Sequence, residues 1–259
     1  MTLRNSAVAL SFALSLFAIG PTKAAGQTPQ PANAGAILSQ LNTAISGGQA
    51  IQQVQLTGTA TWNAGGLLDS GTASLTASTN GSSQLQLTLA ASGQRTETQT
   101  GTGSSADCQW AGADGVANEV AVGNCWKPSL WFFPALSLQP SALPTYLGVV
   151  DLGSGAVGSG PNLYRHLQCQ LGFAIIPSAL ATSVAAQSVS DLGLDPETLL
   201  PAVLSYSILP DSGPPTPIAI EIHYSNYQTV NGVQIPFLIQ RYVNGSLQLS
   251  IAVASAQIG

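Results

Sequence analysis

The chain has 259 residues, of which only 7% are charged, and its formal net charge is −5. An acidic balance of this kind disfavours nucleic acid as a partner. Hydrophobic residues make up 45% of the chain, which excludes a disordered protein and indicates a globular domain whose exposed faces carry neutral polar side chains.

The first 24 residues have the pattern of a secretory signal peptide. Arg4 supplies a positive charge, residues 7–19 are apolar except for two serines, and Thr22-Lys23-Ala24 ends in a small residue suited to cleavage. An apolar run of this length is too short to span a bilayer. We therefore expect export to the periplasm or the extracellular space, followed by a flexible linker over 25–33 and a single domain over 34–259.

Removal of 24 of the 259 residues leaves a chain with few positive charges. It has four basic residues and eleven acidic ones, which give a net charge of −7. The four basic residues are Arg95, Lys127, Arg165 and Arg241. No cysteine stands at the cleavage point to carry a lipid, and no later segment is long and apolar enough to span a membrane as a helix. Aromatic residues, at 6%, are sparse for the girdles of a membrane barrel. We expect a protein that is not integral to a membrane.

Three cysteines remain in the exported chain, where oxidation is permitted. Cys108 and Cys125 enclose a glycine-rich loop, so a disulfide between them is the first expectation. Cys169 pairing with either one, or remaining as a buried thiol, is left open because sequence alone cannot assign pairing.

The N-terminal half of the domain predicts one helix followed by strands. Apolar residues recur at helical spacing over 37–45 and stop at Gly47-Gly48. The period then changes to two over 53–62, 73–77 and 85–89, with Asn80-Gly81 as a turn. In the middle, the aromatic cluster 131–133 is expected either to fill the core or to cover a cavity. Further on, 146–151 and 163–171 read as a strand pair and 178–188 as a second short helix.

The C-terminal part predicts a three-stranded antiparallel meander over 218–230, 233–243 and 246–254. Its turns, Asn231-Gly232 and Asn244-Gly245, are the preferred residues of type I′ hairpins. Regular turns would pair Tyr242 with Leu247 and Leu238 with Ile251 on one face, leaving Phe237, Ile239 and Tyr224 on the other. Both faces are then apolar, and the second must be covered by a helix, another sheet or a ligand.

Motifs that carry chemistry are weak in this chain. Gly153 to Gly158 match a dinucleotide fingerprint, but a strand rather than a helix follows, so a simple β-loop is favoured. Glu221 and His223 share one strand face and could transfer a proton, although a structural ion pair is the ordinary outcome. We expect no catalytic residue, no cofactor and no metal site.

The tail resembles a known family. The stretch Glu221-Ile-His-Tyr-Ser-Asn-Tyr-Gln-Thr-Val-Asn-Gly-Val-Gln-Ile-Pro-Phe237, with Asn244-Gly245 and the alternating residues after it, is similar to the end of LolA-like periplasmic domains. Residues 194–201 resemble the turn and strand that precede it. The resemblance implies a mainly β (α+β) fold: one strongly curved antiparallel sheet that forms an open half-barrel, with one or two short helices packed on the concave side. In the carriers of this family the hollow holds acyl chains.

The leading hypothesis is a non-enzymatic exported protein that binds an apolar ligand, a lipid or the acyl chain of a lipoprotein, in the half-barrel. The residues expected to line the ligand are Trp131, Phe132, Phe133, Leu238, Tyr242, Leu247, Leu249 and Ile251. The alternative is an interaction or sensor module that uses the half-barrel as a scaffold for an envelope protein. An enzyme that uses Glu221 and His223 is a third hypothesis.

Overall fold

The computed structural model describes residues 34–101, 106–125, 131–139, 147–171, 186–210 and 216–259. The predicted signal peptide and linker, and most of the helix expected over 178–188, lie outside these residues.

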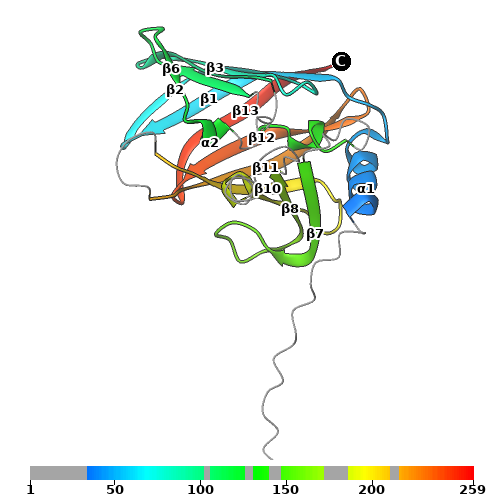
Figure 1. Ribbon diagram of the computed structural model, residues 1–259. Coiled ribbons are helices and arrows are strands. Elements are labelled where there is room, and N and C mark those ends of the chain that lie inside the picture. Colours follow the sequence, from blue (N-terminus) through cyan, green and yellow to red (C-terminus); the bar gives the residue numbers. More distant parts are fainter. Residues whose placement is uncertain (1–33, 102–105, 126–130, 140–146, 172–185, 211–215) are drawn as a thin grey trace, which may run out of the picture.

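The described residues form one antiparallel sheet with short helices beside it (Figure 1). In chain order the elements are α1 (Ala34–Ser46), β1 (Gln53–Ala64), β2 (Leu67–Ser78), β3 (Ser83–Leu89), β4 (Gly93–Thr100), β5 (Asp107–Ala111), β6 (Ala117–Glu119), α2 (Val122–Cys125), η3 (Pro134–Leu136), β7 (Leu147–Ala156), β8 (Leu163–Leu171), β9 (Ser190–Leu194), β10 (Pro201–Ile208), β11 (Ile218–Val230), β12 (Val233–Val243) and β13 (Ser246–Ile258). The strand order is β6-β5-β4-β3-β2-β1-β13-β12-β11-β10-β9-β8-β7. The C-terminal strand therefore joins the N-terminal meander to the rest of the sheet.

The sheet bends so strongly that distant strands face each other. β4 and β12 are separated in it by β3, β2, β1 and β13, which in a flat sheet would place them roughly 24 Å apart. Nevertheless, Glu97 of β4 and Arg241 of β12 form an ion pair with an N–O distance of 2.8 Å. The predicted open half-barrel is confirmed, and Figure 1 shows its two end strands, β6 and β7, at the top and bottom of the view.

Helix α1 covers part of the concave side. Its apolar residues Ile37, Leu38, Leu41 and Ile45 are at most 5% exposed, and the helix packs against β12, β7 and η3. It ends where predicted, because Gly47 and Gly48 adopt positive φ angles of 61° and 87° and their N–H groups bond back to the last helical turn.

Both predicted type I′ turns of the C-terminal meander are present. Asn231 and Asn244 have φ angles of 49° and 47°, and the glycine after each is also positive. Tyr242 pairs with Leu247 as expected.

The other predicted pair of that meander is wrong. Ile251 pairs with Ile239, and Leu238 pairs with Ala252, because Gln248 is an extra residue that forms a bulge in β13 opposite Arg241 and Tyr242. The bulge moves Leu249 and Ile251 to the same concave face as Ile239. Arg241 then enters that face beside Leu249.

Two glycines allow the strands to approach too closely for a side chain. A Cβ at Gly58 would lie 2.1 Å from the carbonyl oxygen of Ala252, and one at Gly71 would lie 1.9 Å from that of Thr88. Gly58 also marks the register shift between β1 and β13. Bulges and glycine kinks are devices that curve a sheet, and these two positions lie in the strands where the sheet turns from its N-terminal to its C-terminal half.

Substitution of Gly58 by alanine should destabilise the fold, because the new Cβ meets backbone atoms that cannot move alone. We expect Gly58→Ala to lower the free energy of unfolding by about 1–3 kcal/mol, measured by urea titration of tryptophan fluorescence. The control is Gly35→Ala in α1, where a Cβ meets nothing within 4 Å and stability should stay equal or rise slightly. Equal stability of both variants would contradict this role for Gly58.

Candidate functional site

A cavity of about 420 Å³ lies on the concave side of the half-barrel. Its volume is within the range of small-molecule sites, about 300–1,000 Å³. Apolar and aromatic side chains form most of its wall; those that the argument uses are Leu85, Trp110, Val120, Trp131, Phe132, Tyr206, Ile208, Ile218, Ile220 and Val243. Seven of the ten come from strands in both halves of the sheet, so the curvature creates the cavity.

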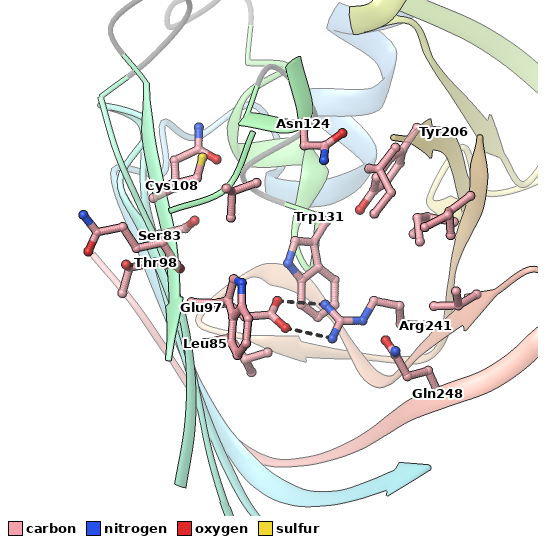
Figure 2. A pocket seen from close by; sticks show the side chains of 18 of the residues that line it. Ser83, Leu85, Glu97, Thr98, Cys108, Asn124, Trp131, Tyr206, Arg241 and Gln248 are labelled. Carbon is pink, nitrogen blue, oxygen red and sulfur yellow. Dashed lines mark hydrogen bonds and ion pairs between the residues drawn. The ribbon is translucent and has the colours of Figure 1, made fainter. Parts of the chain in front are cut away.

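The charged part of the wall is an ion pair that crosses the hollow (Figure 2). The two terminal nitrogens of Arg241 donate to the two carboxylate oxygens of Glu97 at 2.8 and 3.0 Å. Arg95, two residues before Glu97 on the same strand, adds a longer contact through Nε at 3.4 Å. The bidentate geometry is the strong form of this interaction.

Tryptophan rings surround both guanidinium groups. The Arg95 guanidinium lies 4.8 Å from the ring centre of Trp62 and 5.1 Å from that of Trp110, and the Arg241 guanidinium lies 5.6 Å from Trp62 and 5.1 Å from Trp131. These distances are typical of cation–π contacts. The rings hold two cations in an apolar wall that would otherwise exclude them.

The ionisation of the site follows from these contacts. Burial raises the pKa of Glu97, but the charge and hydrogen bonds of Arg241, and then those of Arg95, outweigh it and lower the pKa from 4.5 to about 2. Burial lowers the pKa of Arg241, and the Glu97 carboxylate more than restores it. Burial also raises the pKa of Tyr206 to about 12. At neutral pH the wall therefore holds an ionised pair next to a neutral phenol.

Helix α2 closes one side of the cavity. A disulfide joins Cys125 at its end to Cys108 of β5, with the two Cα atoms 5.7 Å apart. On the other side, the Asn124 amide donates to the carbonyl of Leu209 at 2.6 Å and accepts from the N–H of Leu209 at 2.8 Å. The helix is thus fixed to strands from the two opposing halves of the sheet, and Asn124 faces the cavity in Figure 2. The predicted disulfide is confirmed, and Cys169 is a buried free thiol.

Five of the residues predicted to line a ligand lie on the concave side. Trp131 and Phe132 line the cavity, and Phe133, next to them in the chain, is 2% exposed in the core. Leu249 and Ile251 belong to the same core cluster at 1% and 0% exposure. The aromatic cluster therefore does both things considered for it, since it fills the core and covers a cavity.

The other three predicted residues lie on the convex face. Tyr242 packs its ring 4.8 Å from that of His223, Leu247 is 37% exposed beside it, and Leu238 pairs with Ala252 on that face. They do not line the cavity. The physical reason is the bulge at Gln248, which places Leu247 and Leu249 on opposite faces of the sheet.

Glu221 and His223 form a convex-face cluster with the β7–β8 turn. Glu221 Oε1 accepts from Ser159 N at 2.7 Å, while Oε2 accepts from Ser159 Oγ at 3.2 Å and lies 3.2 Å from His223 Nε2. A Cβ at Gly158 would lie 2.8 Å from the carboxylate. Since the carboxylate lies between the serine and the histidine, the arrangement fixes a turn and does not pair a nucleophile with a base. Gly153 to Gly158 belong to β7 and this turn, so the β-loop interpretation is confirmed.

Sequence reasoning missed Arg95, Glu97, Arg241 and Tyr206 as site residues. One signal was present: Arg241 continues the alternation of Val233, Ile235 and Ile239, the side of β12 that is buried. Among the described residues no group of three or more His, Cys, Asp or Glu is placed to hold a metal. In the same residues no helix has the length and apolar character needed to cross a membrane.

Comparison with solved structures gives the same fold. A candidate outer membrane lipoprotein-sorting protein domain from Vibrio parahaemolyticus is similar with a TM-score of 0.54 and 7% identity, covering 88% of this chain and 93% of the other. A LolA superfamily protein from Nitrosomonas europaea has a TM-score of 0.50 and 14% identity, covering 87% and 93%. A DUF1329 family protein from Desulfovibrio piger has a TM-score of 0.53 and 10% identity, covering 89% and 94%. No protein-family model and no curated protein matches the sequence. The predicted resemblance to the LolA-like half-barrel is therefore confirmed for the fold.

Acid should remove the contribution of Glu97 to stability. Because its pKa falls from 4.5 to about 2 on folding, the stabilisation is complete above pH 4.5 and is lost as the pH falls towards 2, on the order of 3 kcal/mol. Glu97→Gln should be less stable at pH 7 but decline less steeply below pH 4.5, as measured by urea unfolding at each pH. Glu119→Gln, which alters an exposed carboxylate of β6, should keep the wild-type slope. Parallel declines in Glu97→Gln and the wild type would contradict the assignment.

Removal of the disulfide should loosen α2. The double variant Cys108→Ser/Cys125→Ser should lose about 3 kcal/mol of unfolding free energy, because the loop of 17 residues is no longer closed in the unfolded chain. Asn124→Ala, which removes the two side-chain bonds to Leu209, should lose less. Thiol titration in denaturant should find one thiol per chain before reduction, and a count of three would contradict the bond.

Proposed function

We propose that the chain is an exported, non-enzymatic binding protein that holds an apolar molecule, a lipid or acyl chain, in the hollow of the half-barrel. The observation that carries the proposal is the cavity itself. Most of the concave side is packed, with side chains such as Leu56, Leu75 and Leu87 at 0% exposure, yet a volume of about 420 Å³ remains between Trp131, Phe132 and the strands opposite. An apolar-walled volume with a few polar groups is typical of a ligand site.

The disulfide supports the compartment in this proposal. Disulfides persist in oxidising environments such as the periplasm and the extracellular space, and Cys108–Cys125 forms one wall of the cavity. Together with the signal-peptide pattern of residues 1–24, it favours a site that assembles after export. Lipids and lipoprotein acyl chains are apolar molecules of that compartment.

A variant that fills the cavity should abolish binding. Ile218 lines the cavity from β11, whereas its neighbour Ala219 is exposed on the other face. An uncharged fluorescent probe, N-phenyl-1-naphthylamine, reports binding, and fatty acids should displace it. We expect Ile218→Trp to weaken binding of the probe and of fatty acids at least tenfold, and Ala219→Trp to leave both unchanged. Thermal unfolding of both variants controls for folding.

Native mass spectrometry of protein purified from the periplasm should show an added lipid mass. Empty wild-type protein that binds neither probe nor fatty acid would overturn the proposal.

A second candidate function is a scaffold for an envelope protein. The observation that favours it is the start of β2, directly after the β1–β2 turn, where Leu67 and Leu68 are 61% and 69% exposed. Adjacent exposed leucines are a feature of contact surfaces. Cross-linking in the intact envelope separates the two candidates: a scaffold yields one defined protein that is lost in Leu67→Ser/Leu68→Ser, and a carrier yields bound lipid that this variant keeps.

A further inference from the structure

The cavity holds a positive charge that its own residues do not neutralise. Of the residues that line it, Arg95 and Arg241 are cationic and Glu97 alone is anionic. The exported chain has only four basic residues among eleven acidic ones. Half of its cations therefore lie in one hollow, which also contains a single one of its carboxylates. The hollow is therefore positive, whereas the exported chain as a whole is negative.

The guanidinium groups also keep unused donors. Arg95 uses only Nε, in the 3.4 Å contact with Glu97, and its two terminal nitrogens make no hydrogen bond to the described residues. Arg241 is 9% exposed, and its Nε is buried with no partner among those residues. A buried donor without an acceptor is destabilising. The terminal nitrogens of Arg95, which lines the cavity, are the donors open to an acceptor that enters it.

Tyr206 adds a neutral donor at the same place. It lines the cavity from β10, its hydroxyl points towards the Glu97–Arg241 pair in Figure 2, and that hydroxyl makes no hydrogen bond within the described part of the chain. Because burial raises its pKa to about 12, the phenol keeps its proton at neutral pH and can donate it in a hydrogen bond. The surrounding walls, Ile208, Ile218 and Ile220, are apolar.

We propose that this cluster, Arg95 with Tyr206, binds the acidic head of an amphiphile whose tail occupies the apolar part of the cavity. The inference rests on the proposed function and specifies the ligand class: a single apolar chain that ends in one acidic group, a carboxylate or a phosphate. Glu97 does not repel such a head, because the two guanidinium groups that flank it leave the cluster with a net charge of +1. An amphiphile with a cationic head would be repelled by the same positive charge.

The test compares amphiphiles that share one chain and differ in the head. Hexadecanoic acid, hexadecyl phosphate, hexadecanol and hexadecylamine each compete with N-phenyl-1-naphthylamine at pH 7.5. We expect at least one of the two acids to bind about tenfold more tightly than the alcohol, the size of one charge-assisted hydrogen bond, and the amine to bind more weakly than the alcohol. The acid with the lower dissociation constant identifies the head.

Arg95→Gln should reduce the preference for the acid over the alcohol to within about twofold, and thermal unfolding of the variant checks that the fold is intact. Tyr206→Phe should reduce the preference for the acid over the alcohol by a smaller factor. Arg165→Gln is the matched control, because it removes the same charge from a pair with Asp151 outside this cavity and should leave the preference as it is.

The outcomes separate the two proposals. If acid and alcohol bind equally to the wild type, or if Arg165→Gln lowers the preference as much as Arg95→Gln does, the head site is wrong although the hollow still binds chains. If none of the four compounds displaces the probe, or the probe itself does not bind, the proposed function fails together with the head site.

Discussion

The ion pair between Glu97 and Arg241 is the interaction on which the rest of the structure depends. It joins strands that four others separate along the sheet, so it can form only when the sheet is bent. Charges taken from water are costly, and a buried pair contributes little net stability unless its geometry is good, but loss of one partner costs about 3–5 kcal/mol. The pair therefore exists only in the bent sheet, and removal of one partner would leave the other charge buried in the hollow.

The same pair keeps the hollow from closing completely. An apolar half-barrel would bury most surface if its two halves collapsed onto each other. Here a guanidinium and a carboxylate, with the rings of Trp62 and Trp131 against them, hold the walls apart at a fixed distance. Helix α2, held by a disulfide at one end and by Asn124 at the other side, spans the same gap. The result is a cavity with an apolar wall and a cationic end, which suits an amphiphile better than a purely apolar molecule.

Much of the fold could be predicted because its signals are local. The helix from Ala34 to Ser46, the two Asn-Gly hairpins and the Cys108–Cys125 bond each depend on residues close together in the chain. Leu249 and Ile251 lie on the concave side, although the predicted register that put Ile251 on the face of Leu238 was wrong. The convex positions of Leu238, Tyr242 and Leu247 were not predicted, because one bulged residue, Gln248, changes the register, and nothing in the local pattern marks it.

The charged part of the site could not be predicted for a related reason. Glu97 and Arg241 are 144 residues apart, and their contact exists only through the curvature of a sheet whose strand order places the last strand between β1 and β12. The alternation along β12 marks the buried side on which Arg241 lies, but it does not identify what Arg241 meets there. A partner for a buried charge is a property of the assembled sheet.

Electron density in the hollow is the most direct measurement of the central claim, that the bent sheet forms an amphiphile site with its charged end at the tryptophan-lined guanidinium groups. Crystals of the protein purified from the periplasm without detergent should show elongated density between Phe132 and the strands opposite, ending within hydrogen-bond distance of Arg95 and Tyr206. A hollow that contains only ordered water, or that side chains of the protein fill, would contradict the account.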